Sequence, residues 1–412
     1  MAANPSIQLG TDGNWAIKED NLLAYKKDGT RFFNKEFDFA RGTTATFIGE
    51  DGLIQESAID VPRIDFSDST NGALLLEPSR TNNLLRSEEF DNASWTKFSG
   101  GTGIAPVVTA NYTTSPDGSN NADRVVFDKG SGTSGSDLSQ MRQIVSDVGQ
   151  GVSSVYIKSN TSDSYTMGID PVGNATLITI TPEWQRFTYS ETTNDRLTIG
   201  LRASQTSNYA DVSIWGAQME AGNYATSYIP TSGSAVSRNG EVCNNSGSAQ
   251  DFNDSEGVLF ADIKWLDESG AYRGISVSDG SSNDNNRIQI NFNQNTGNLV
   301  FNVTVGGVHQ AIYSSTIYPS NYSKVAIKYK ANDFAFWVNG IEIYTDNLGI
   351  TYPANTLSEL KFNSPLGAVP FYGKTKDLKV FKRAMSDGEL YLLTVPQYQS
   401  YQEMATALNY TL

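Results

Sequence analysis

The sequence predicts an all-β protein: a small N-terminal β segment followed by two antiparallel β-sandwich (jelly-roll) domains. Apolar and polar residues alternate in many short runs, clusters of Gly, Ser, Asn and Asp separate these runs, and only one segment carries the signals of a helix. Alternation with a period of two is typical of strands that bury one face, and such clusters mark the turns between strands.

Residues 1–82 form the first predicted domain, a segment for attachment or assembly. Turn signals divide it at Asp28-Gly29, Asp51-Gly52 and Asn71-Gly72. These dipeptides favour tight hairpins because both residue types tolerate a positive φ. Phe37 and Phe39 alternate with polar neighbours, but apolar periodicity is otherwise sparse. We expect a thin core that needs a neighbouring domain for stability.

Residues 83–235 form the second predicted domain. Val155 and Ile157 alternate with Tyr156 and Lys158, and further runs of this kind recur with turn signals between them. Strands at intervals of about 8–12 residues favour a sandwich or jelly roll. The polar, apolar-poor segment 231–248 marks the boundary that follows.

Residues 236–395 form the third predicted domain, a second sandwich, and 396–412 are a C-terminal tail. Asn339-Gly340 between two alternating runs is the strongest short hairpin signal of the chain. The single predicted helix follows Ser386, which forms a capping box with Glu389, and it ends at Pro396.

Composition excludes several classes of function. The formal net charge of −15 disfavours nucleic acid and anionic membrane surfaces as partners. One cysteine, Cys243, and one histidine, His309, cannot form a disulfide framework or a Cys/His zinc cluster. No apolar run reaches the ~18 residues of a membrane span, and the N-terminus lacks the pattern of a signal peptide. We therefore expect synthesis in a cytoplasm and no membrane insertion.

Catalytic and cofactor sites are not predicted. His309 lies beside a glycine turn, and Cys243 has no second histidine to activate it. Glu36 and Asp38 resemble part of a glucanase strand, but Arg41 stands where that pattern has its last carboxylate. The loop 279–286 is rich in oxygen donors that suit calcium, without EF-hand spacing. We expect no enzyme activity, no metal and no cofactor.

Glycan binding is the function that the side chains favour. Aromatic rings in polar loops can stack on sugars, and the candidates are Tyr209, Tyr272, Tyr318 and Tyr322. The alternative for each tyrosine is packing at the edge of a sandwich. Trp184, Trp215 and Trp337 lie in strand-like runs and are expected in the cores.

Several strings resemble bacteriophage tail-fibre and related virion appendage proteins, in which they flank a carbohydrate-binding-module-like jelly roll. They are residues 37–46 (FDFARGTTAT), 49–54 (GEDGLI), 61–66 (VPRIDF), 74–85 (LLLEPSRTNNLL), 87–90 (SEEF), 93–95 (ASW), 183–187 (EWQRF), 214–222 (IWGAQMEAG) and 225–231 (ATSYIPT). Residues 336–340 (FWVNG) and 376–390 (KDLKVFKRAMSDGEL) resemble a concanavalin/laminin-G-like sandwich. Neither resemblance identifies a ligand-binding residue in this sequence.

The resemblance implies a virion structural protein, made in the host cytoplasm, that binds host cell-surface polysaccharide without cleaving it. It also implies other virion proteins as partners and a homo-oligomer, most often a trimer. The main alternative is a virion structural protein without receptor binding, such as a head fibre, a capsid decoration or a tail adaptor. A polysaccharide-degrading enzyme and a non-viral secreted lectin are the remaining alternatives.

Overall fold

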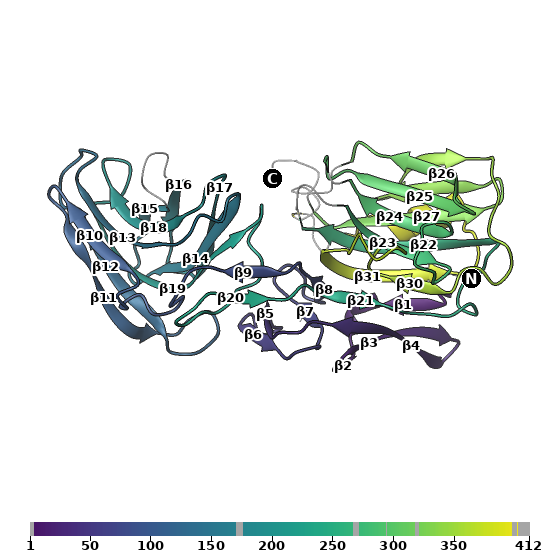
Figure 1. Ribbon diagram of the computed structural model, residues 1–412, viewed down its shortest axis with the longest axis horizontal. Coiled ribbons are helices and arrows are strands. Elements are labelled where there is room, and N and C mark those ends of the chain that lie inside the picture. Colours follow the sequence, from purple (N-terminus) through teal and green to yellow (C-terminus); the bar gives the residue numbers. More distant parts are fainter. Residues whose placement is uncertain are drawn as a thin grey trace. The chain divides into compact units, whose positions relative to one another are not determined.

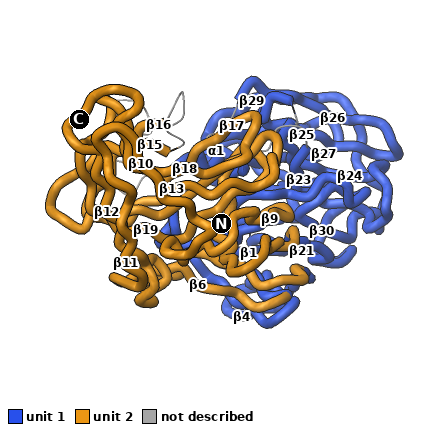
Figure 2. The backbone as a smooth tube through the Cα atoms, turned by 60° about the vertical axis from the view of Figure 1, so that its left-hand side comes forward, with its two compact units in different colours: residues 1–40, 60–76, 241–412 blue, residues 41–59, 77–240 orange. Residues whose placement is uncertain are grey.

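Antiparallel β-sheets make up nearly all of the regular structure in the computed structural model of the chain, which confirms the predicted all-β class (Figure 1). The structure describes residues 4–169, 176–266, 272–293, 295–317, 321–397 and 402. Two compact units divide the chain (Figure 2). Unit 1 comprises residues 1–40, 60–76 and 241–412, and unit 2 comprises residues 41–59 and 77–240.

Unit 1 contains a twelve-stranded sheet and a five-stranded sheet that share one large core. The larger sheet has the order β21-β4-β3-β1-β31-β22-β27-β28-β29, with β2, β7 and β8 attached, and the smaller has the order β26-β25-β24-β23-β30. The elements are β1 (Ile7–Leu9), η1 (Thr11–Gly13), β2 (Ile17–Lys18), β3 (Asn21–Asp28), β4 (Arg31–Ala40), β7 (Arg63–Asp65), β8 (Ala73–Leu76), β21 (Val242–Asn244), β22 (Glu256–Trp265), β23 (Arg273–Ser278), β24 (Arg287–Phe292), β25 (Leu299–Val305), β26 (Val308–Ser314), β27 (Ser323–Lys330), β28 (Phe334–Val338), β29 (Ile341–Asp346), β30 (Glu359–Lys361), β31 (Gly373–Phe381) and α1 (Asp387–Thr394).

Local sequence signals account for several elements of unit 1. Asn339 and Gly340 have φ values of 49° and 82° in the turn that joins β28 to β29, as the hairpin signal predicts. The capping box of α1 is present, with both the Ser386 and the Glu389 side chains bonded to backbone N–H groups. Leu390 of α1 packs in a small cluster with Phe260 and Trp337, so the helix covers part of the larger sheet.

Unit 2 is a sandwich of two five-stranded sheets with the orders β10-β13-β18-β15-β16 and β11-β12-β19-β14-β17. The elements are β5 (Ala45–Ile48), β6 (Ile54–Ser57), β9 (Arg80–Asn82), β10 (Thr96–Gly100), β11 (Ile104–Thr113), β12 (Ala122–Asp128), β13 (Leu138–Ile144), β14 (Gly151–Ser159), β15 (Tyr165–Ile169), β16 (Thr176–Ile180), β17 (Gln185–Glu191), β18 (Arg196–Arg202), β19 (Tyr209–Ala221) and β20 (Val236–Arg238). The hairpin β5–β6 and the pair β9–β20 form two further small sheets.

The core of unit 2 follows from alternation along its strands. Val155 and Ile157 of β14 and Leu197 and Ile199 of β18 are fully buried in one apolar cluster. Successive side chains of a strand point to opposite faces, so Tyr156 and Lys158 lie on the outer face of the sheet that contains β14. This outer face carries the site described below.

Residues 1–82 are shared between the two units. Strands β1 and β8 both pair with β31, so they complete the sheet of unit 1, whereas the hairpin β5–β6 belongs to unit 2. Strands of three or four residues bury too little apolar surface to be stable alone, which explains why they pair with larger sheets. The chain passes from unit 2 to unit 1 at Gly240 and Glu241, within the polar segment 231–248.

Cys243 differs from its expected place in a polar linker. Its side chain is 1% exposed, because β21 pairs with β4 and turns the thiol into the core of unit 1. Burial raises the pKa of this thiol well above its ordinary value, and the carboxylates of Glu241 and Asp38 act in the same direction. His309 is exposed on β26. Within the described ranges, no helix has the length and apolar character to cross a bilayer.

Candidate functional site

A cavity of about 400 Å³ opens on unit 2. Its walls come from the hairpin β5–β6, from the turn that follows β11, from β14, and from the segment just before β17. The lining residues are Ile48, Gly52, Leu53, Ile54, Thr114, Ser115, Pro116, Tyr156, Lys158 and Trp184. Two aromatic rings, one ammonium group and three hydroxyl groups, one of them the phenol of Tyr156, therefore meet in one cavity.

Strand β14 presents two of these side chains from a rigid position in the sheet. Tyr156 pairs with Trp215 of β19, and Lys158 pairs with Ser213 of the same strand. The neighbours of both residues in β14 are core residues, so the alternation of the strand fixes the direction of the two side chains.

Trp184 is predicted as a core residue but instead lines the cavity, where it is partly buried. Its indole Nε1 donates a hydrogen bond to the carbonyl of Thr114, with an N···O distance of 3.2 Å. The ammonium nitrogen of Lys158 lies 5.2 Å from the centroid of the indole ring. Both contacts hold the ring in place, so its apolar surface is arranged before a ligand arrives. Trp215 and Trp337 are buried, as predicted.

The ring of Tyr156 packs against a row of aromatic side chains. The rings of Tyr156 and Trp215 lie 5.6 Å apart edge to face, and the rings of Trp215 and Tyr228 lie 4.6 Å apart. The guanidinium of Arg186 lies 5.4 Å from the Tyr156 ring and donates hydrogen bonds to the carbonyl of Thr226 and to Ser154. Such contacts restrict the rotamer of Tyr156.

The hairpin β5–β6 is tied to the sandwich at two points. Ile54 N–H donates to the carbonyl of Pro116 at 2.9 Å, and the hydroxyl of Thr46 donates to the carbonyl of Tyr228 at 2.5 Å. Gly52 at the tip of the hairpin has φ 78°, a conformation that glycine adopts without strain. The hairpin is therefore a fixed wall of the cavity.

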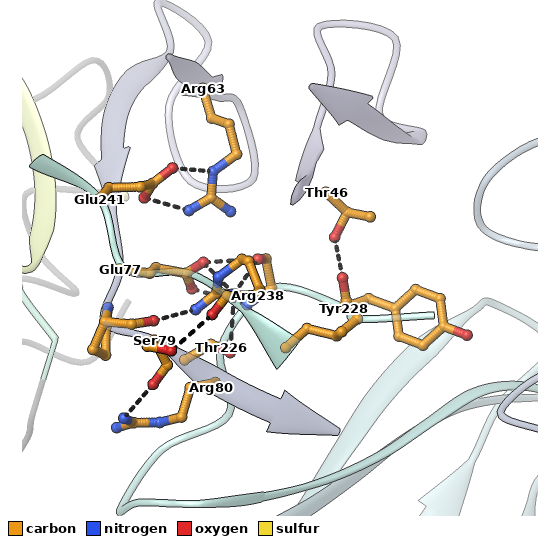
Figure 3. A network of polar contacts seen from close by, with 12 residues as sticks. Thr46, Arg63, Glu77, Ser79, Arg80, Thr226, Tyr228, Arg238 and Glu241 are labelled. Atoms are coloured by element: carbon orange, nitrogen blue, oxygen red, sulfur yellow. Dashed lines mark hydrogen bonds and ion pairs between the residues drawn. The ribbon is translucent and has the colours of Figure 1, made fainter. Parts of the chain in front are cut away.

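Two buried ion pairs are drawn in Figure 3, one in each unit. In unit 2, Arg238 contacts Glu77 at 2.8 Å and donates to Ser227 and to the carbonyl of Pro78. These contacts hold in place the segment that carries Tyr228. The ring of Tyr228 in turn packs against Trp215. In unit 1, Arg63 donates two hydrogen bonds to Glu241, and both side chains are fully buried.

Two carboxyl groups near the cavity have pKa values shifted in opposite directions, but neither group belongs to the lining. Burial acts to raise the pKa of Asp117, but hydrogen bonds from Ser115 and Ser119 outweigh it, so that pKa is lowered. Burial raises the pKa of Glu88, against a hydrogen bond from Tyr228. The side chain of Glu88 also accepts a hydrogen bond from Asn121 at 2.8 Å. Both carboxyls are thus bound within the local structure.

The lining of the cavity offers surfaces for stacking and groups for hydrogen bonding. Tryptophan and tyrosine rings offer flat apolar surface with a polar edge. Most glycoside hydrolases use a pair of carboxyl groups, one on either side of the scissile bond. Among the described residues that line the cavity, none is an aspartate or a glutamate.

The structure does not bring the four predicted tyrosines together. Tyr209 is 45% exposed at the start of β19 and, by alternation through Asp211 and Ser213, shares a sheet face with Lys158. Tyr272 is exposed in unit 1, just before β23. Tyr318 lies outside the described residues.

Tyr322, also in unit 1, has both its hydroxyl and its ring engaged. The hydroxyl donates to Asp68 at 2.9 Å, and the ammonium of Lys376 lies 3.7 Å from the ring centroid. Burial, together with the charge of Asp68, raises the pKa of Tyr322 far above its ordinary value.

The sequence contained a partial signal for the cavity. Alternation placed Tyr156 and Lys158 opposite the core residues of one strand. The wall formed by the hairpin β5–β6 could not be predicted from the sequence. Ile48 and Leu53 precede Tyr156 by about a hundred positions, and no local pattern shows that their hairpin packs against β14.

Side-chain oxygens of the oxygen-rich loop 279–286 accept hydrogen bonds from the protein. The carboxylate of Asp279 accepts hydrogen bonds from Ser281 and from Asn286, and Asn286 accepts one from the N–H of Gly306. No group of three or more His, Cys, Asp or Glu side chains in the described part of the chain is placed to hold a metal ion.

A comparison with protein families matches residues 264–390 to the concanavalin A-like lectin/glucanases superfamily. This range lies in unit 1 and agrees with its sandwich of antiparallel sheets. A comparison with curated proteins finds no match.

A comparison with solved structures gives matches of low similarity. The Ruminococcus gnavus IT-sialidase CBM40 bound to alpha2,3 sialyllactose is 18% identical, covers 37% of this chain and 94% of its own, and has a TM-score of 0.31. Trypanosoma rangeli sialidase is 8% identical, with coverage of 95% and 82% and a TM-score of 0.29. Domains LG4-5 of the mouse laminin alpha1 chain are 8% identical, with coverage of 79% and 98% and a TM-score of 0.24. TM-scores below 0.5 support no conclusion about this chain, and the similarity to lectin-like domains is confined to residues 264–390.

Proposed function

We propose that this chain is a glycan-binding adhesion subunit of a bacteriophage virion appendage, such as a tail fibre, and that it binds host surface polysaccharide without cleaving it. The observation that carries the proposal is this cavity of unit 2, in which Trp184, Tyr156 and Lys158 meet and no carboxylate stands among the described lining residues. The similarity of residues 264–390 to lectin-like domains supports it.

Stacking of sugar rings on Trp184 and Tyr156 supplies most of the binding energy in this proposal. A single shallow site of this kind binds weakly, with a dissociation constant near millimolar, or roughly −4 kcal/mol. Several copies on one particle raise the avidity by orders of magnitude, because later contacts become intramolecular. A homotrimer attached to other virion proteins provides such copies. Tyr209, Tyr272, Tyr318 and Tyr322 are proposed as secondary contacts.

The virion part of the proposal is supported by the strings at residues 37–95 and 183–231 that resemble phage appendage proteins. The protein is then made in the host cytoplasm and works on the assembled particle. The absence of carboxylates from the described lining supports binding without cleavage.

The test is binding of the purified protein to host cells and to their extracted polysaccharide. We expect the parent protein to bind both and to release no reducing ends. Trp184→Ala should reduce binding at least tenfold without changing the β-type circular dichroism spectrum. Tyr112→Ala is the matched control, because Tyr112 is an exposed aromatic residue of β11 outside the cavity.

Three outcomes would contradict the proposal. If the parent protein binds neither cells nor polysaccharide, the chain is a structural subunit without receptor binding. If Trp184→Ala and Tyr112→Ala reduce binding equally, the cavity is not the binding site. Release of reducing ends would make the protein an enzyme.

A further inference from the structure

Lys158 is the one charged residue among the described residues that line the cavity of unit 2. The other lining residues are aromatic, aliphatic, proline, glycine or hydroxyl-bearing. The ammonium of Lys158 contacts the ring of Trp184, and no carboxylate within the described ranges is paired with it.

The two other lysines of unit 2 show the contrast. Lys129 donates hydrogen bonds to the carbonyl of Gly132 and to the side chain of Asn208. Lys97 donates to the carbonyl of Asn92 at 3.0 Å. Each of these ammonium groups is held by oxygen atoms of the protein, whereas that of Lys158 faces an aromatic ring in an open cavity.

The position of Lys158 over Trp184 makes the stacking surface selective. A sugar that stacks on this ring displaces the ammonium from it and so removes a favourable cation–π contact. A neutral sugar offers the displaced ammonium hydrogen-bond acceptors but no charge. A sugar that bears a carboxylate replaces the lost contact with an ion pair, which is stronger where water is partly excluded.

We propose that the cavity selects a sugar unit that carries a carboxylate, such as a uronic or nonulosonic acid, with Lys158 as the residue that recognises the charge. This inference rests on the proposed function and specifies its ligand class. The lysine ammonium is a compact charge on a flexible stem. Unlike the guanidinium of arginine, it does not require a planar pair of acceptor oxygens. Sulfated or phosphorylated sugars share the anionic chemistry, and the experiment separates them.

The experiment is binding of the full-length protein to an array of neutral, carboxylated, sulfated and phosphorylated microbial glycans. The best carboxylated ligand is then compared with its carboxyl-reduced form, which keeps the ring and loses the charge. We expect the parent protein to bind the carboxylated form at least about tenfold more tightly, a difference of 1.4 kcal/mol. That preference should shrink as ionic strength rises.

Variants assign the preference to one residue. Lys158→Met keeps the aliphatic stem and should bind both forms equally, whereas Lys158→Arg should keep the preference. Lys97→Met is the control, because Lys97 lies outside the cavity, and it should behave as the parent.

Each failure has a distinct meaning. If the parent protein binds no glycan at all, the proposed function is wrong. If it binds neutral glycans and their carboxylated relatives equally, or if Lys158→Met keeps the preference, the proposed function stands and the charge selection is wrong. Preference for sulfated or phosphorylated glycans over carboxylated ones also overturns the inference.

Discussion

At the scale of single residues, the most consequential polar groups are those that unit 1 buries completely. Arg63 and Glu241 are both fully buried and joined by two hydrogen bonds of 2.8 and 2.5 Å. A buried charge that loses its partner has neither water nor a counter-ion. We expect Glu241→Gln to lower the free energy of unfolding of unit 1 by about 3–5 kcal/mol.

The control for this prediction is Glu256→Gln, which removes one partner of an exposed ion pair with Lys330 in the same unit. Exposed pairs contribute at most about 1 kcal/mol, so this variant should unfold almost as the parent does. Urea unfolding followed by pulse labelling of Cys243 reports on unit 1 specifically. Equal losses in the two variants would contradict the assigned importance of the buried pair.

Cys243 should be inert in the folded protein and reactive once unit 1 unfolds. Burial raises its pKa well above the ordinary value, so the native state keeps the proton at a pH where the unfolded chain releases it. Since the unfolded state then binds fewer protons, the contribution of this thiol to stability is full below about pH 8.5 and falls as pH rises further.

Thiol labelling at pH 9 with and without urea measures this directly. Fast labelling without urea would contradict the burial of Cys243. The decline of stability above pH 8.5 should be smaller in Cys243→Ala than in the parent.

At the scale of elements, the turn at Asn339 and Gly340 shows what local sequence determines. Both residues have positive φ in the hairpin β28–β29, and a Cβ on Gly340 would lie 3.4 Å from Tyr391. We expect Gly340→Ala to lower the free energy of unfolding by about 1–2 kcal/mol, because an L-residue disfavours this conformation.

Gly388 is the matched control, since it lies in the first turn of α1 and a Cβ there would meet nothing within 4 Å. Alanine is a better helix former than glycine by up to about 1 kcal/mol, so Gly388→Ala should stabilise the protein or leave it unchanged. Thermal unfolding of both variants makes the comparison. A loss in Gly388→Ala as large as that in Gly340→Ala would refute the assignment of positive φ as the cause.

Signals of this local kind explain which elements were predictable. The hairpin at Asn339-Gly340, the capping box at Ser386 and the alternation of Val155 with Tyr156 each depend on residues close in sequence. The packing of hairpin β5–β6 against β14 and the contact of Tyr322 with Asp68 join residues that are far apart in sequence. Such contacts depend on topology, which no period of the sequence encodes. The cavity is therefore only half predictable from the sequence, which gives no information about the spatial neighbours of the four candidate tyrosines.

At the scale of the whole molecule, the two units depend on pairings between distant segments. β1 pairs with β31, so Gln8 lies opposite Lys379, and the N-terminal strands complete the sheet of unit 1. We predict in addition a homotrimer, as the resemblance to fibre proteins implies. Light scattering of the purified protein should give a mass about three times 44.8 kDa. A single species of 44.8 kDa at micromolar concentration would contradict it.

The central claim is that glycan binds at Trp184, and fluorescence tests it most directly. Trp184 is one of six tryptophans and lines the cavity, where it is partly buried, whereas Trp215 and Trp337 are buried. We predict that glycan extracted from the host shifts or quenches the emission of the parent protein and that Trp184→Phe, which keeps a ring but removes the indole, loses most of this change. The same spectral change in Trp184→Phe would place the ligand elsewhere and contradict the claim.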